Sequence, residues 1–167
     1  MATPSPATLG TLLRHLIEIL DGSVEEAYAQ SGLDYRPRYT PVVRALLELG
    51  PASIRTLSLH AGITHSAVSQ TVAQMAKHRL VKLSPGEDGR ERIVALTAKA
   101  EAMLPALERQ WAATNVAANE LDAELSFPLS ALLREALGAL ETRSFSERID
   151  QASKRLKTST KRKYVTH

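Results

Sequence analysis

Three consecutive residues, Gly62, Ile63 and Thr64, constrain the fold most, because they separate two stretches whose apolar residues recur at helical spacing. Glycine ends a helix readily, since it adopts the left-handed conformation, and Ile63 is placed to cover that end. Threonine then caps the next helix. With Ser53 as the cap of the first helix, the sequence predicts two short helices joined by the tight turn of a helix-turn-helix.

The hydrophobic pattern changes from helical spacing to alternation directly after Leu80. Val81 and Leu83 alternate with lysine and serine, and turn-forming residues then fill positions 85–89. The mainly apolar segment 92–96 follows. The sequence therefore predicts a β-hairpin behind the second helix, in the position of a wing.

Helical spacing also precedes this segment. A first helix begins near Leu9 and extends toward Gln30, and a loop composition follows at 31–39. The next helix has Thr40 as its expected N-cap, Pro41 directly behind it, and a glycine at its end.

Two further helices are predicted after the hairpin. Thr97 caps a long helix, in which Pro105 lies too far from the start to be a first-turn proline and predicts a kink or a break. The apolar positions of the final helix are Leu129, Leu132, Leu133, Ala136, Leu137 and Leu140.

These patterns predict a mainly α protein with a small β-wing. We divide it into an N-terminal dimerisation helix and loop (1–39), a winged helix-turn-helix domain (40–100), C-terminal dimerisation helices (101–153) and a flexible basic tail (154–167). The first and last helices each carry a row of apolar residues. Together these rows offer more apolar surface than a winged domain of about 60 residues needs for its own core. A bundle shared by two copies and a core closed within one chain would both cover them.

Composition excludes several classes of function. The chain has no cysteine, so it forms no disulfide, thiolate metal site or thiol redox sensor. It has no phosphate-binding glycine loop, and His60 and His65 fall on separate helices, so no metal, cofactor or enzyme activity is expected. No apolar run approaches the length of about 20 residues that spans a bilayer, and the start lacks the pattern of a secretory signal. We expect a cytoplasmic protein with no membrane partner.

The basic character of the chain is concentrated near its end. Six basic residues against one acid give positions 150–167 a net charge of +5, which leaves −2 of the total of +3 for the rest. Such a tail either adds contacts to nucleic-acid phosphates or is a solvated segment that contributes solubility. The basic residues are Lys154, Arg155, Lys157, Lys161, Arg162 and Lys163.

The helix after Thr64 separates into two faces. The inward positions are apolar, whereas Ser66, Ser69, Gln70 and Ala73 form a small polar outward face. Small side chains let a helix approach base edges in the major groove, and glutamine pairs with adenine there. We therefore predict DNA contacts from His65, Ser66, Ser69 and Gln70. The alternative is an ordinary solvated helix face.

The hairpin tip offers a second set of candidates. Arg90 and Arg92 are placed to reach an adjacent minor groove, and Asp88 is placed to pair with Arg90. The alternative is a charged, soluble turn.

The combination resembles a known family. The resemblance lies in the run "SIRTLSLHAGITHSAVSQTVAQMAKHRLVKLSPGEDGRERIVALTAKA", especially "DGR" followed by "VALT". It is similar to the winged helix-turn-helix of the MarR (multiple-antibiotic-resistance regulator) family, and with its flanking helices it covers about Leu9 to Leu140. It implies a transcriptional regulator that binds double-stranded DNA sequence-specifically, as an obligate homodimer on a pseudo-palindromic operator. We expect a repressor.

This chain departs from the family pattern at three positions. Arg79 and Ala100 stand where family members commonly have glycine, and Gln70 stands near a position where they often have arginine. If Arg79 adopts the left-handed conformation, the strain is about 1 kcal/mol. Because Gln70 replaces the arginine of family members, their operator sequences cannot be assumed for this chain.

The resemblance also implies release of DNA by a small aromatic or anionic ligand, bound between the winged domain and the dimer helices. Tyr35, Arg36, Arg38 and Tyr39 are candidates to stack on and pair with it. The alternative is that the tyrosines and Trp111 pack in the core while the arginines are solvated. A winged helix that binds protein instead of DNA is the other function the fold allows.

Overall fold

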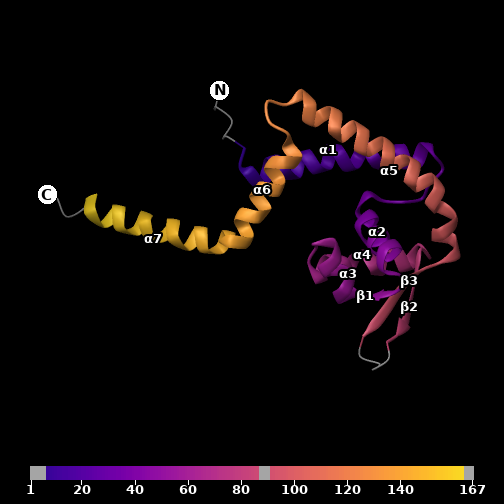
Figure 1. Cartoon of the computed structure of the whole chain (residues 1–167). Coiled ribbons are helices and arrows are strands. Elements are labelled where there is room, and N and C mark those ends of the chain that lie inside the picture. Colours follow the sequence, from indigo (N-terminus) through magenta and orange to yellow (C-terminus); the bar gives the residue numbers. More distant parts are fainter. Residues whose placement is uncertain (1–6, 87–90, 164–167) are drawn as a thin grey trace. The chain divides into compact units, whose positions relative to one another are not determined.

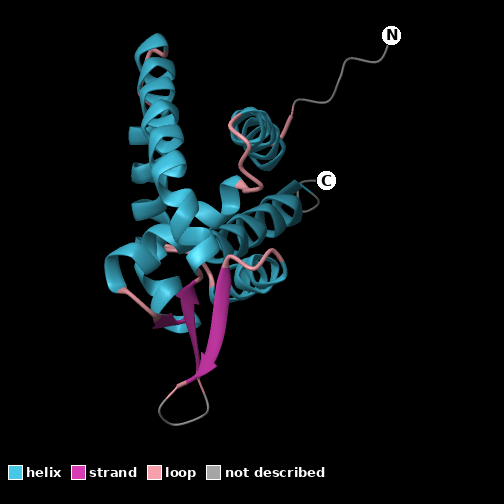
Figure 2. Cartoon of the chain, turned by 90° about the vertical axis from the view of Figure 1, so that its right-hand side faces the viewer, coloured by secondary structure: helices cyan, strands magenta, loops and turns pink. Residues whose placement is uncertain are grey.

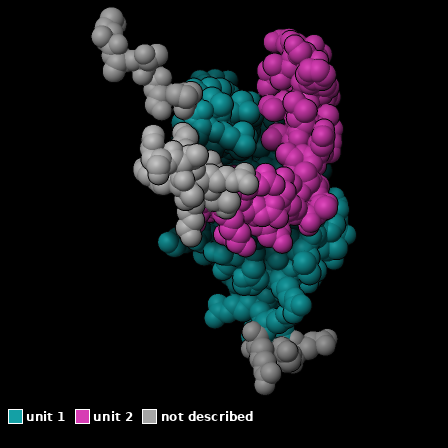
Figure 3. All heavy atoms as spheres, turned by 90° about the vertical axis from the view of Figure 1, so that its left-hand side faces the viewer, with its two compact units in different colours: residues 1–114 teal, residues 115–167 magenta. Residues whose placement is uncertain are grey.

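The computed structural model describes residues 7–86 and 91–163, except for the side chains of 158–163. The described chain forms two units, residues 1–114 and 115–167, which Figure 3 colours separately. In chain order the elements are α1 (Leu9–Gln30), η1 (Pro37–Tyr39), α2 (Thr40–Leu49), β1 (Ala52–Ser53), α3 (Ile54–Ala61), α4 (His65–Lys77), β2 (Val81–Pro85), β3 (Arg92–Leu96), α5 (Ala98–Glu124), α6 (Leu129–Thr142) and α7 (Phe145–Lys163), as labelled in Figure 1. The predicted mainly α fold with a small β-wing is confirmed.

The hairpin is part of a three-stranded antiparallel sheet in the order β1-β3-β2 (Figure 2). Val81 lies opposite Leu96 and Pro85 opposite Arg92, which confirms the predicted hairpin. Strand β1, which pairs Ser53 with Ile93, was not predicted from the sequence. A two-residue strand is too short to show an alternating pattern, and it forms here because β3 offers it a free edge. The strand ties the start of α3 to the wing.

The two α-helices before the helix-turn-helix, α1 and α2, also begin close to their predicted positions. Thr8 caps α1 by accepting a hydrogen bond from the Thr11 amide at 3.2 Å. α2 begins at Thr40 itself, because the preceding η1 turn makes Tyr39 its N-cap instead of the predicted Thr40. It ends at Gly50, as predicted, with a positive φ of 73°.

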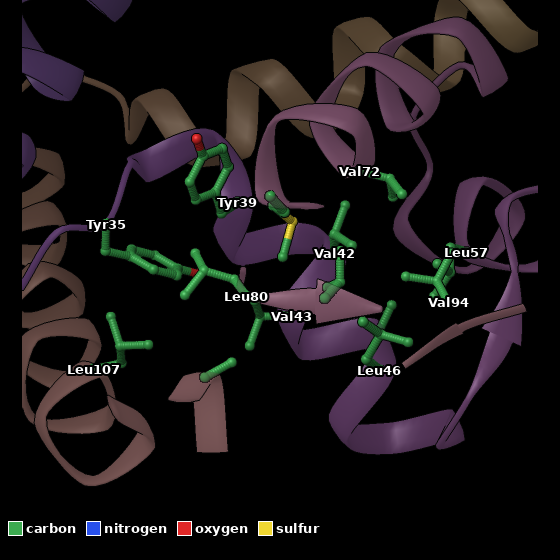
Figure 4. Packing of buried hydrophobic residues seen from close by; sticks show 14 of the residues in the cluster. Tyr35, Tyr39, Val42, Val43, Leu46, Leu57, Val72, Leu80, Val94 and Leu107 are labelled. Atoms are coloured by element: carbon green, nitrogen blue, oxygen red, sulfur yellow. The ribbon is translucent and has the colours of Figure 1, made fainter. Parts of the chain in front are cut away.

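Aromatic side chains join residues 1–39 to the winged domain (Figure 4). Tyr28, Tyr35 and Tyr39 form successive edge-to-face pairs with ring centroids 5.1 and 5.6 Å apart. The Trp111 indole donates a hydrogen bond to the Tyr28 hydroxyl at 3.1 Å inside the core. Trp111 therefore packs as a core residue. Residues of 1–39, 40–100 and the first half of α5 share one core, which crosses the divisions drawn from the sequence.

The end of α4 is closed by a left-handed residue that is not glycine. Arg79 has a φ of 58°. Its amide donates to the Ala76 carbonyl at 3.0 Å, and the Leu80 amide donates to the Met75 carbonyl at 2.9 Å. These two bonds form a Schellman motif, in which buried Met75 and Leu80 supply the accompanying apolar residues. The expected conformation of Arg79 is confirmed.

Thr97 reinforces this end of α4. Its hydroxyl donates to the Arg79 carbonyl at 2.7 Å, and its amide donates to the Leu80 carbonyl at 3.1 Å. The same hydroxyl accepts from the Ala100 amide at 3.3 Å, so Thr97 caps α5 as predicted. One side chain therefore connects the end of α4 to the start of α5.

Helix α5 runs through Pro105 from Ala98 to Glu124 without interruption. The possibility of a break at Pro105 is wrong. Proline removes a single helical hydrogen bond, and Pro105 is exposed, so its ring costs no core packing.

After α5, the described residues 129–163 form two helices where the sequence suggested one. Arg143 is extended and ends α6. Ser144 then begins α7 in a capping box: its amide donates to the Glu147 carboxylate at 2.8 Å, and its hydroxyl accepts from the Glu147 amide at 3.2 Å. The Ser144 hydrogen bonds hold the pKa of Glu147 below its usual value. Residues 154–163, assigned to a flexible tail, continue α7.

Within the described ranges, no helix is long and apolar enough to cross a membrane.

Replacing Arg79 with glycine should raise the free energy of unfolding by about 1 kcal/mol, because glycine has no Cβ to strain the left-handed conformation. Chemical denaturation of the two proteins measures this difference. Lys77→Gly, on the right-handed last turn of α4, is the matched control and should lower stability by about 1 kcal/mol. If both substitutions are destabilising, Arg79 is not strained.

Candidate nucleic-acid interface

The turn between α3 and α4 is built as the sequence predicted. The Ser53 hydroxyl accepts from the Thr56 amide at 3.2 Å and begins α3. Gly62 ends it with a φ of 64°, and the Ile63 amide donates to the Ser58 carbonyl at 3.1 Å. The Thr64 hydroxyl accepts from the Ala67 amide at 3.3 Å and begins α4. Each helix terminus is therefore satisfied locally, and the turn is fixed.

The two faces of α4 differ in burial as well as in polarity. Val68, Val72 and Met75 are each at most 1% exposed. On the other side His65, Ser66 and Gln70 are exposed, whereas Ser69 is half-buried. The exposed residues belong to the first two turns of α4. Three of the four predicted contacts are therefore free to meet a ligand, and Ser69 is only partly so.

The wing is described up to the base of its tip. The Gly86 amide donates to the Glu91 carbonyl at 2.8 Å and continues the hairpin one step past Pro85 and Arg92. Arg92 is exposed at this base. Asp88 and Arg90 lie outside the described residues, so their predicted pairing stays a prediction.

A hollow of about 250 Å³ connects the helix-turn-helix to the wing. Its walls come from the starts of α3 and α4 and from β3. The lining residues are Ser53, Ile54, Arg55, His65, Glu91 and Arg92. The structure thus brings together His65 and Arg92, which the sequence analysis had placed on separate elements.

Arg55 is a candidate that the sequence analysis missed. It is exposed in the first turn of α3 and lines the same hollow as His65 and Arg92. The sequence signal was an arginine directly behind a helix cap, but only the pairing of β1 with β3 places it beside the wing. Arg55, at the start of α3, and Arg92, at the start of β3, lie beside the starts of α3 and α4 and favour anions, because the N-terminal ends of helices carry partial positive charge.

The four predicted ligand contacts do not share one surface. Tyr35 and Tyr39 are 4% and 0% exposed, whereas Arg36 and Arg38 are exposed. Burial raises the pKa of the Tyr35 hydroxyl, and the nearby Thr40 hydroxyl opposes this only in part. The tyrosines therefore lie in the core. Arg38 retains one aromatic contact, with its guanidinium carbon 6.0 Å from the Tyr39 ring centroid.

Among the described residues, no three histidine, aspartate or glutamate side chains gather closely enough to hold a metal ion.

Comparison with known proteins bears on the same segment. Residues 31–91 match the sequence profile of the MarR family. This range contains α2, α3, α4 and β2. No curated protein is a significant match to the chain.

Solved structures of transcriptional regulators resemble most of the chain. A probable transcriptional regulator from Pseudomonas aeruginosa is 24% identical with a TM-score of 0.55, over 80% of this chain and 96% of that one. The PcaV regulator from Streptomyces coelicolor, in complex with its natural ligand, is 20% identical with a TM-score of 0.60, over 86% and 99%. The MOSR regulator from M. tuberculosis, in complex with DNA, is 18% identical with a TM-score of 0.62, over 81% and 96%. These similarities establish the fold.

Thr64→Ala should lower the free energy of unfolding by about 1 kcal/mol, because the first turn of α4 loses its cap. Ser66→Ala is the control. It removes an exposed hydroxyl two residues away and should change stability by less than about 0.5 kcal/mol. Thermal or chemical denaturation compares the two, and equal losses would contradict a capping role for Thr64.

Proposed function

We propose that this chain is a sequence-specific transcriptional repressor, because its residues 31–91 match the sequence profile of the MarR family. In this proposal it binds a pseudo-palindromic operator in double-stranded DNA as a homodimer, in the cytoplasm, and acts by binding and not by catalysis. The resemblance to a regulator solved in complex with DNA supports the DNA-binding part.

The observation that carries the proposal is the exposed polar start of α4 beside two arginines. His65, Ser66 and Gln70 are exposed at this end, and Arg55 and Arg92 line the adjoining hollow. A major groove admits a helix whose contact face is small and polar, while arginines neutralise the flanking phosphates. An ordinary solvated helix face does not require this arrangement of cations around its start.

The contacts divide into two physical roles. Gln70 offers an amide that can accept and donate to one adenine, so its contribution depends on base sequence. Arg55 and Arg92 offer charge, so theirs depends mainly on salt. Arg90 and Asp88 keep their predicted role at the minor groove. Gln70 is therefore the principal reader of sequence in this proposal.

Exposed leucines on the flanking helices support a homodimer. α6 contains no buried residue, and Leu137 is 62% exposed. Separately, α1 buries only Tyr28 and exposes Leu9 and Leu12 to 68% and 56%. Apolar surface of this extent marks a binding interface on a soluble protein. A second copy covers it with matched helices, and two-fold symmetry then repeats the DNA-binding surface at a spacing of about 34 Å.

Release of DNA by a small ligand is the regulatory part of the proposal. The similarity to a regulator in complex with its natural ligand supports it. The residues first considered for this role are divided between core and surface, so the ligand contacts lie elsewhere than on a shared surface of Tyr35, Arg36, Arg38 and Tyr39.

The operator for this test is selected from a random DNA pool. Gln70→Ala should lose about 1–3 kcal/mol of binding free energy that depends on the identity of one base pair, and the preference at the other base pairs should change little. Arg92→Ala should weaken binding to every DNA sequence. It should also reduce the slope of the logarithm of the binding constant against the logarithm of salt concentration by about 1. Fluorescence anisotropy across a salt series measures both effects. Arg36→Ala removes an exposed arginine outside the interface and should bind like the parent. If Gln70→Ala and Arg92→Ala also bind like the parent, the surface serves a protein partner instead.

Leu137→Glu should shift the chain from dimer to monomer, because dimerisation would then bury the glutamate carboxylate at the interface without a partner of opposite charge. Leu59→Glu is the control, since Leu59 is 75% exposed on α3, outside the proposed interface. Sedimentation equilibrium at micromolar concentration distinguishes the two masses. A parent protein that sediments as a monomer would rule out the homodimer.

A further inference from the structure

The last helix, α7, changes character partway along its length (Figure 1). Its large apolar residues are Phe145, Ile149 and Leu156, which follow one another by four and seven positions and so fall on one side of the helix. Residues 157–163 contain no apolar residue, although the backbone stays helical to Lys163. The second half of α7 therefore has no apolar face with which to pack on a core or on another helix.

The charges of α7 divide in the same way. Its two acids, Glu147 and Asp150, stand in the first two turns, and residues 151–163 contain no acid. The Glu147 carboxylate is already bound to the Ser144 amide at 2.8 Å. Six basic residues follow these acids, so the second half of the helix carries a positive charge that the helix itself does not balance. They are Lys154, Arg155, Lys157, Lys161, Arg162 and Lys163.

This excess charge makes the second half of α7 repel itself. No acid stands within four positions of Arg155, Lys157 or Lys161, and Lys157 and Lys161 have the i, i+4 spacing at which like charges weaken a helix. Arg155 and Lys157 are exposed, and neither has an ion-pair partner among the described side chains. A bound polyanion would remove this repulsion and stabilise the helix.

The density of the charge indicates which polyanion fits. At a rise of about 1.5 Å per residue, positions 154–163 extend over about 14 Å and carry about one positive charge per 2 Å. Duplex DNA carries about one negative charge per 1.7 Å of its axis. We infer that the second half of α7 binds the phosphodiester backbone of duplex DNA through contacts that are independent of base sequence.

The charge of the rest of the chain gives this segment its importance. Outside positions 150–167 the net charge is −2, so that part of the protein is not attracted to DNA at long range. The attraction that precedes the reading of bases then comes from α7, whose cations release counterions from the duplex. This consequence rests on the proposed DNA-binding function, whereas binding of α7 to a duplex of any sequence does not require an operator.

Two other partners fit the second half of α7 less well. A basic helix that lies on an anionic membrane keeps an apolar face below its cations, but the apolar residues of α7 end at Leu156. A second copy of the same segment carries the same charge and would repel it. Duplex DNA requires neither an apolar face nor acidic residues in the helix.

The test uses the full chain with Arg155→Gln and Lys157→Gln together, because glutamine has nearly the same helix propensity as arginine and lysine. Fluorescence anisotropy across a salt series measures binding to the selected operator and to a duplex of unrelated sequence. At about 50 mM salt the double substitution should weaken binding to both duplexes at least about tenfold. The slope of the logarithm of the binding constant against the logarithm of salt concentration should fall by about 2 for each bound chain.

Arg36→Gln together with Arg109→Gln is the matched control. Both arginines are exposed and lie outside α7 and outside the surface proposed to contact DNA. The pair changes the net charge of the chain by the same amount, so it should leave the salt slope unchanged if local phosphate contacts decide it. Circular dichroism should show equal helix content in all three proteins, which excludes unfolding of α7 as the cause of weaker binding.

Equal slopes in the parent and in the α7 variant, or an equally large loss in the control, would overturn the inference. Sedimentation with vesicles of phosphatidylserine and phosphatidylcholine tests the membrane alternative. If the α7 substitutions abolish binding to these vesicles but leave duplex binding intact, the partner is an anionic membrane and the inference is wrong. A parent that binds the operator and the unrelated duplex equally would contradict sequence-specific recognition and leave the result on α7 standing.

Discussion

The hydroxyl of Thr97 occupies the junction on which the rest of the winged domain depends. It donates to the carbonyl of Arg79 at 2.7 Å and caps α5 through the Ala100 amide. The Thr97 amide donates a hydrogen bond to the Leu80 carbonyl at 3.1 Å and keeps the two strand ends together. Lys99 adds a bond from its ammonium group to the His78 carbonyl at 3.0 Å. The carbonyls at the end of α4 are thus bound by the chain that leaves the wing, so α4, the hairpin and the start of α5 hold a fixed geometry.

That fixed geometry explains why a strained residue is tolerated at position 79. The left-handed turn lets Leu80 enter the core at 1% exposure while α4 stops and β2 begins. A right-handed residue would continue the helix and carry the wing away from it. The strain of about 1 kcal/mol is small beside the free energy of burying Leu80 and Met75.

Two hollows flank α3, and at least one arginine lines each of them. The one at the wing has Arg55, Arg92 and Glu91 beside the start of α4. The one against α2 is lined by Arg44, whose guanidinium carbon lies 4.9 Å from the centre of the Trp111 ring.

Local signals in the sequence determined the order of elements. Gly62 ends α3 at its own position, and the side chains of Ser53, Thr64 and Thr97 each cap a helix through the amide three residues further on. These caps and turns could therefore be predicted from neighbouring residues alone. The alternation of apolar and polar residues after Leu80 likewise predicted the hairpin. The division of α6 from α7 rests on the Ser144–Glu147 capping box, a local signal that was overlooked. The absence of a break at Pro105 was harder to predict, because it depends on how the folded helix compensates one lost backbone hydrogen bond.

Tertiary structure alone decided which residues meet. β1 exists because β3 offers it an edge, and only this pairing brings Arg55 to the wing. The ring stack places Tyr35 and Tyr39 in the core and leaves Arg36 and Arg38 outside, although the four are close in sequence. Arg44 lies 67 residues from Trp111 and contacts it all the same. Capping hydrogen bonds within the first turn of a helix are local and so are determined by the sequence. Burial, aromatic contacts and bonds such as that from Thr97 to Arg79 join distant residues and form only with the core.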